Sequence, residues 1–240
     1  MNSSVLFRDL LKSWKSSIGF FLPPTIKPFF LVTVKTILQT YSILFEQLWP
    51  LITIAGIAQL GYMWFCIPSK LGCFFTWIIA HTLSMLIVFL MLLIIRPSIK
   101  AKALDYYRDY IPHFLLFWIV SLFFAYCNAP HCLSSPLFIF YMFFLLDTPF
   151  DLKNIFLNGW RSLKMIIFGL PYCGVVWIIS SVFLAFSMII LSLPLMVLFQ
   201  NIDVALQAAQ FVIYFLFPVV YAWYANFYVK RVRDQFSLYF

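Results

Sequence analysis

Charged residues are scarce in this chain of 240 amino acids, and their scarcity excludes an ordinary water-soluble domain. Only 10% of the residues are Asp, Glu, Lys or Arg, whereas soluble domains carry about a quarter. Glycine is also scarce, at seven residues, and the sequence contains no glycine-rich phosphate-binding loop and no nucleophile elbow. The common signatures of nucleotide binding and serine hydrolysis are therefore excluded.

Groups that perform acid–base chemistry or bind metals are few. The chain has eight acidic residues and three histidines, and most of the carboxylates lie in or beside basic stretches. The spacing of Cys127, His131 and Cys132 matches no zinc signature with a second half elsewhere. We therefore expect a protein that is not an enzyme and that carries no cofactor or metal.

Hydrophobic residues, by contrast, make up 64% of the chain, and the mean hydropathy is +0.98. Because a backbone in lipid must pair its own polar groups, long apolar runs are predicted to be helices. The third and fourth runs are short for a bilayer core of about 30 Å. The predicted fold is an all-α integral membrane protein with six transmembrane helices, at about 51–67, 72–95, 112–127, 136–150, 172–193 and 208–229.

The basic residues predict the orientation. Lysine and arginine in short loops mark the cytoplasmic side, and fifteen of the sixteen lie in alternate gaps between the runs, with Lys70 as the exception. Both termini are therefore expected in the cytoplasm. In plan the chain resembles bacterial inner-membrane proteins that begin with an amphipathic leader, without a motif that identifies a family. The expected parts are a cytoplasmic leader (1–48), a six-span membrane domain (49–229) and a basic cytoplasmic tail (230–240).

The polar segments on the cytoplasmic side are predicted to be amphipathic helices. Apolar residues repeat at helical spacing from Phe7 to Leu22, from Val34 and from Ile99. Basic helices with aromatic anchors lie in the plane of the interface. The net charge of +8 is accordingly expected to meet the anionic headgroups of a lipid bilayer rather than nucleic acid. A fourth apolar stripe consists of Phe156, Trp160, Leu163 and Ile167.

Gln59 and His81 are predicted to form a polar pair inside the membrane. Both lie about eight to ten residues from the loop between the first two spans, which is about 12–15 Å at 1.5 Å per residue. An interhelical hydrogen bond at that depth contributes about 0.6–2 kcal/mol, and this structural role is favoured. The alternative is a proton relay.

Four of the five cysteines are predicted to face the outside. Cys66 and Cys73 flank the first outer loop, and Cys127 and Cys132 flank the second. In an oxidising compartment they could form disulfides within each loop or between the two hairpins. The favoured alternative is that they are simply small apolar residues of membrane helices.

Pro218 lies near the centre of the predicted sixth span and is expected to kink it. Proline has no backbone N–H, so the carbonyl of Tyr214 loses its helical partner. Broken helices in transporters come in corresponding pairs, and no other span has a proline near its centre. A kink that serves packing is therefore favoured over a transport site.

Two classes of function remain. A non-enzymatic scaffold, accessory subunit or envelope-organising protein is favoured by the in-plane helices and by the near-absence of polar residues within the spans. Such a protein would bind a membrane-protein partner or form a homo-oligomer. A small permease or transporter with a polar site near Gln59 and His81 is the alternative.

Overall fold

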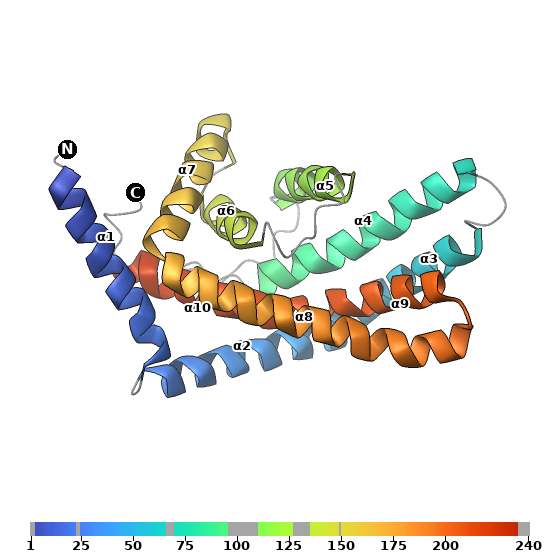
Figure 1. Cartoon of the computed structure of the whole chain (residues 1–240). Helices are drawn as coiled ribbons and strands as arrows, with labels where there is room; N and C mark the ends of the chain where they lie inside the picture. Colours follow the sequence, from blue (N-terminus) through green and yellow to red (C-terminus); the bar gives the residue numbers. More distant parts are fainter. Residues whose placement is uncertain are drawn as a thin grey trace. The chain divides into compact units, whose positions relative to one another are not determined.

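The computed structural model describes residues 3–22, 25–65, 70–95, 110–126, 135–148 and 150–234. Every regular element within these ranges is a helix (Figure 1), which confirms the all-α prediction for them. In chain order the elements are α1 (Ser3–Ile18), the 3-10 turn η1 (Gly19–Phe21), α2 (Ile26–Gln47), α3 (Trp49–Phe65), α4 (Lys70–Ile95), α5 (Ile111–Tyr126), α6 (Ser135–Asp147), α7 (Leu152–Phe168), α8 (Leu170–Phe199), α9 (Ile202–Tyr214) and α10 (Phe217–Asp234).

Four stretches of helix are long and apolar enough to cross a membrane, among the residues that the structure describes. Three of them coincide with the predicted second, fifth and sixth spans, and the fourth lies in the predicted leader. The chain therefore has the helices that an integral membrane protein needs. The four stretches are Ile26–Gln47, Phe74–Ile95, Leu170–Phe199 and Ile202–Arg231.

Helix α2 differs from the prediction for the leader. The sequence predicts a helix from Val34, whereas α2 begins at Ile26 and continues without a break to Gln47. Pro28 does not interrupt the helix, because a residue in the first turn has no helical partner for its N–H to lose. Lys35 and Gln39 are exposed on α2, as the amphipathic pattern predicts.

Three apolar helices are shorter than the four stretches above. Helices α3, α5 and α6 have 17, 16 and 13 residues, or about 26, 24 and 20 Å at 1.5 Å per residue. They coincide to within a few residues with the predicted first, third and fourth spans. The count of six spans stays a prediction.

The chain divides into two compact units, each assembled from separate stretches. Unit 1 comprises Met1–Ile37, Arg96–Ser180 and Val220–Phe240, and unit 2 comprises Leu38–Ile95 and Ser181–Val219. These units reflect contacts within the folded chain. The predicted leader, membrane domain and tail describe instead where each part lies relative to the bilayer. The division into these three parts stays a prediction.

The core of unit 1 is built from aromatic rings. Phe140, Tyr172, Tyr224 and Phe227 are fully buried. The rings of Tyr172 and Phe227 stack with their centroids 4.1 Å apart and their planes 8° apart. Phe140 meets Tyr224 edge to face at 5.5 Å. Such pairs contribute about 0.5–1.5 kcal/mol each beyond the area that they bury, so this cluster ties α6, α8 and α10 together.

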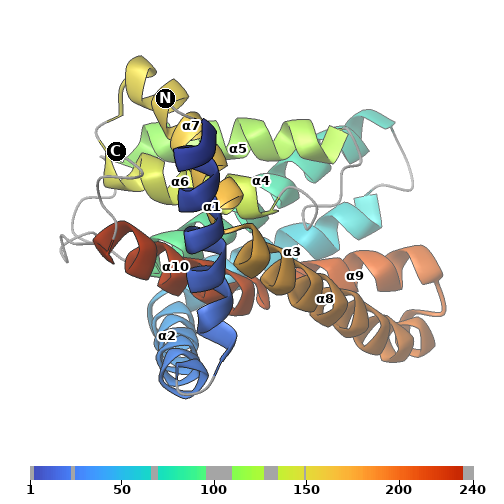
Figure 2. The same ribbon diagram turned by 60° about the vertical axis from the view of Figure 1, so that its left-hand side comes forward.

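The core of unit 2 lies where α3 packs along α4, which are side by side in both views (Figures 1 and 2). Leu44, Ala55, Ile87 and Met91 form its buried centre. Phe211 of α9 packs against that centre, and its ring would be 3.8 Å from a Cβ placed on Gly56.

Helices α1 and α7 expose apolar side chains and bury several uncharged polar ones, while the charged residues of α1 are exposed as well. On α7, Phe156 is 77% exposed, whereas Asn158 and Ser162 are fully buried. On α1, Phe7 is 61% exposed, whereas Ser17 is fully buried. A helix at the surface of a water-soluble protein has the opposite arrangement. The predicted stripes of these two helices therefore exist, but they face away from the protein.

Candidate functional site

The predicted polar pair lies on two helices that pack together. Gln59 of α3 is half-buried, and His81 of α4 is buried. The imidazole of His81 stacks on the ring of Trp77, with centroids 5.3 Å apart and planes 20° apart. A hydrogen bond between Gln59 and His81 stays a prediction.

One more polar side chain accompanies His81. Ser84 follows three residues later on α4, which places it on the same face of the helix. It is 1% exposed, and its hydroxyl has no hydrogen-bond partner in the part of the chain that the structure describes. Serine in a membrane helix ordinarily bonds a neighbouring helix or its own preceding turn. The environment of His81 is thus more polar than the predicted pair alone.

The predicted outer disulfides fall mostly outside the described residues. Cys66, Cys127 and Cys132 lie there, as does the side chain of Cys73. The disulfide hypothesis therefore stays a prediction. Cys173, which the sequence placed toward the cytoplasm, is a buried free thiol.

The helix that contains Pro218 is interrupted just before it. Helix α9 ends at Tyr214, and α10 begins at Phe217. Proline has no N–H to donate to the carbonyl of Tyr214, and its ring crowds that carbonyl, which accounts for a break on this side of Pro218. Within unit 2 the hydroxyl of Tyr41 donates to the carbonyl of Phe215 at 2.5 Å. The interruption therefore leaves the carbonyl of Phe215 available, and the side chain of Tyr41 on α2 donates a hydrogen bond to it.

A polar network joins three helices of unit 1 at the end of α6. The hydroxyl of Tyr228 on α10 donates to Oδ2 of Asp147 at 2.8 Å. The next residue, Thr148, accepts from Nδ2 of Asn158 on α7 at 2.7 Å. Oδ1 of the same amide accepts from Nη1 of Arg161 at 3.0 Å. We call these five residues the α6 network.

Arg161 contributes a partly buried positive charge to the α6 network. Burial lowers the pKa of Arg161, and the neighbouring Tyr228 partly offsets this effect. The guanidinium nevertheless keeps its charge, since arginine is not deprotonated in proteins. Asp151 is exposed at the start of α7, and its side chain makes no cap hydrogen bond.

A second network, the α1 dock, fixes the first helix to the rest of unit 1. Nη2 of Arg231 donates to the carbonyl of Ser13 at 2.7 Å and to the hydroxyl of Ser17. Ser13 donates to the carbonyl of Phe168 at 2.9 Å, and Nε1 of Trp14 donates to the carbonyl of Ile167 at 2.8 Å. Carbonyls in the last turn of a helix need hydrogen-bond donors outside that helix. Helix α1 supplies such donors to two carbonyls of α7.

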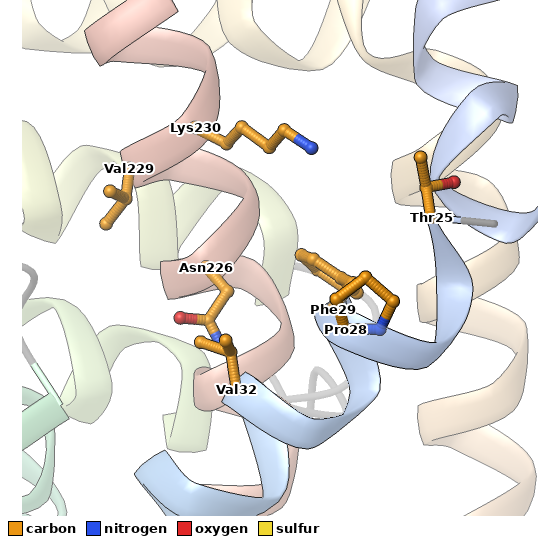
Figure 3. A pocket seen from close by; sticks show the side chains of 7 residues that line it. All are labelled: Thr25, Pro28, Phe29, Val32, Asn226, Val229 and Lys230. Atoms are coloured by element: carbon orange, nitrogen blue, oxygen red, sulfur yellow. The ribbon is translucent and has the colours of Figure 1, made fainter.

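A groove lies between the start of α2 and the end of α10, again within unit 1 (Figure 3). Its volume is about 390 Å³, which is within the range of small-molecule sites. Polar groups come from Thr25, Asn226 and Lys230. The amide of Asn226 donates to the hydroxyl of Thr33 at 3.1 Å, which links α10 to α2 beside the groove.

Most of these contacts are absent from the sequence predictions. None of the residues of the α6 network or the α1 dock is among the predicted site residues, and Tyr228 and Arg231 have partners 81 and 218 positions away. The local feature of the sequence that points to these networks is the presence of polar residues on the predicted cytoplasmic helices.

No group of three His, Cys, Asp or Glu side chains that could bind a metal is gathered in the described residues. Comparisons with protein-family models, with curated proteins and with solved structures found no significant match.

Proposed function

We propose that this chain is a non-enzymatic membrane protein of the bacterial inner membrane that acts as a scaffold, accessory subunit or envelope-organising factor. The observation that carries the proposal is that α1 and α7 expose apolar side chains while they bury uncharged polar ones. Aromatic and aliphatic side chains of both helices are exposed, whereas Ser13, Ser17 and Asn158 hydrogen-bond residues outside their own helix. Outward apolar faces beside basic residues suit a surface that meets lipid or another membrane protein.

The proposed topology has six spans with both termini in the cytoplasm. Helices α3, α4, α5, α6 and α8, together with the α9–α10 pair, provide the spans. Helix α2 stays at the cytoplasmic interface in this proposal, because exposed Lys35 is the tenth of its 22 residues. An exposed lysine at the centre of a spanning helix costs about 2.5–3.5 kcal/mol on insertion scales. An even number of crossings also keeps the leader and tail, both basic, on one side.

The composition of the unit 1 core supports a structural role over a transport role. Its interior is filled by the rings of Phe140, Tyr172, Tyr224 and Phe227. The polar groups of the α6 network and the α1 dock are used to join helices to one another. A conduit for a solute would instead present polar groups toward an open path.

A small permease is the second candidate, and the surroundings of His81 favour it. A histidine inside a membrane protein is by default a candidate for proton transfer. Here it lies in unit 2 with Gln59 on the facing helix and with the buried hydroxyl of Ser84 on its own face. This polar cluster would be the substrate or proton site of the permease.

Two measurements on the purified full chain separate these candidates. Solubilisation of native membranes in a mild detergent is expected to recover the chain with a stoichiometric membrane-protein partner or as a homo-oligomer. The variant F156S/W160S, which changes the outward face of α7, is expected to lose that assembly. The matched control is V197S/L198S, which alters two exposed apolar residues near the end of α8 and leaves the outward face of α7 unchanged.

The permease makes the opposite prediction. A monomeric chain that moves protons or a solute across proteoliposomes, with transport abolished in H81Q and retained in the F156S/W160S variant, would overturn the scaffold proposal. Transport of this kind would also assign the cluster of Gln59, His81 and Ser84 as its site.

A further inference from the structure

The groove between α2 and α10 combines one positive charge with an apolar wall. The side chain of Lys230 extends from α10 across the mouth of the groove toward the side that carries Thr25 (Figure 3). Its ammonium lies 4.8 Å from the centroid of the Phe20 ring, which holds it above an aromatic face. The wall beneath is formed by Pro28, Phe29, Val32 and Val229.

The charges around the groove favour an anion. Lys230 is exposed, and exposed Lys27 immediately precedes Pro28 of the wall. Among the described residues that line the groove, none is acidic. The hydroxyl proton of Thr25 is directed to the carbonyls of Gly19 and Leu22, so this hydroxyl does not donate to an anion. Asn226 adds an amide, which can donate.

The apolar wall favours an anion that carries a hydrocarbon body. Inorganic phosphate in the groove would meet Lys230 but would leave the contacts with Phe29, Val32 and Val229 unused. A phospholipid uses both parts, since its phosphate meets the ammonium and the glycerol end of its chains lies along the wall. Basic recesses between helices on the cytoplasmic side of a membrane recognise anionic lipids by this combination.

We propose that this groove is a binding site for one anionic phospholipid, with Lys230 as the residue that binds its phosphate. The site rests on the proposed membrane placement, in which Lys230 opens the basic cytoplasmic tail. Binding in this groove differs from the general attraction of basic loops to headgroups. The groove has one lysine above one apolar wall, so it holds a single lipid molecule at a defined place. Zwitterionic phosphatidylcholine shares the phosphate but also brings a cation toward Lys230, so it is expected to bind less well.

Native mass spectrometry of the full chain in mild detergent tests the proposal. With phosphatidylglycerol added, one retained lipid is expected per chain, and phosphatidylcholine at the same concentration is expected to be retained less. K230Q is expected to lower the affinity for phosphatidylglycerol about fivefold, the effect of one lysine near a membrane surface. K230R keeps the charge and is expected to retain binding. Inorganic phosphate is expected not to displace the lipid.

The control is Lys153→Gln, which removes an exposed lysine of α7 that does not line the groove. Equal losses in K230Q and K153Q would mean diffuse attraction and would overturn the site. Equal retention of the two lipids, or displacement by inorganic phosphate, would overturn it as well. A chain recovered in the soluble fraction of lysed cells without detergent would instead refute the membrane placement itself, so the two failures are distinguishable.

Discussion

At the scale of single residues, Gly169 decides how closely two helices approach. A Cβ at this position would lie 2.8 Å from the carbonyl oxygen of Met165 and 2.8 Å from the ring of Phe227. That ring is the one that stacks on Tyr172 in the aromatic core. The absence of a side chain therefore allows α10 to reach the junction between α7 and α8.

Replacement of Gly169 by alanine is expected to destabilise the protein. The new methyl group would push against a backbone oxygen and a fully buried ring, and overpacking of this kind costs about 1–3 kcal/mol. The melting temperature of the purified protein in detergent measures the effect. Gly174 on α8 supplies the control, because nothing lies within 4 Å of its Cβ position.

For Gly174→Ala we expect an unchanged or higher melting temperature, since alanine exceeds glycine in helix propensity by about 1 kcal/mol. A G169A protein as stable as the G174A protein would show that Phe227 does not approach α7 as closely as the structure has it.

At the scale of helices, the sequence predicted periodicity better than orientation. The stripe from Phe156 to Ile167 indicated α7 correctly, and the leader stripe likewise indicated α1. Periodicity identifies two faces, but it does not say which one meets protein. That choice depends on distant partners, such as the carbonyl of Ser13, which accepts from a guanidinium 218 residues away. Neither local propensity nor apolar spacing carries information about such a contact.

The α1 dock makes a prediction for the mobility of the first helix. Hydrogen bonds to a charged group contribute about 1.5–3 kcal/mol, and Arg231 donates both to Ser17 and to the carbonyl of Ser13. R231Q is expected to increase the population in which α1 is detached. Trypsin measures this population by its rate of cleavage at Lys12 and Lys15, because proteolysis follows the open form when opening is fast.

Two serines of α1 make a matched pair for the same assay. Ser17 is fully buried in the dock, whereas Ser16 is exposed. Ser17→Ala is expected to accelerate cleavage about fivefold, equivalent to a hydrogen bond of about 1 kcal/mol, and Ser16→Ala is expected to leave the rate unchanged. Equal rates for the two variants would mean that the hydroxyl of Ser17 does not help to hold α1 in the dock.

At the scale of the whole molecule, composition and charge predicted the class of protein and the places of its helices. The predicted second and fifth spans agree with α4 and with most of α8, because long uninterrupted apolar runs leave little choice in lipid. The α6 network and the groove at Lys230 were not predictable in the same way. They are formed by residues such as Asp147 and Tyr228, 81 positions apart, and only the packed fold brings these together.

The topology of the chain depends on whether helix α2 crosses the membrane. This helix is long and apolar enough to cross a membrane, yet exposed Lys35 near its middle opposes a crossing. If α2 crossed in addition to six other spans, the termini would lie on opposite sides, and the basic leader and tail would be separated by the membrane. The positive-inside tendency disfavours that separation, since Lys and Arg resist translocation in short flanking segments.

Reporter fusions decide between these topologies. Alkaline phosphatase, active only outside the cytoplasm, and a fluorescent protein, fluorescent only inside it, are each fused after Gln47, Ser69, Asn201 and Phe240. Phosphatase activity is expected after Ser69 and Asn201, and fluorescence is expected after Gln47 and Phe240. Phosphatase activity after Gln47 would mean that α2 crosses the bilayer with its lysine. The leader would then require a partner for Lys35 within the membrane, and the six-span proposal would be wrong.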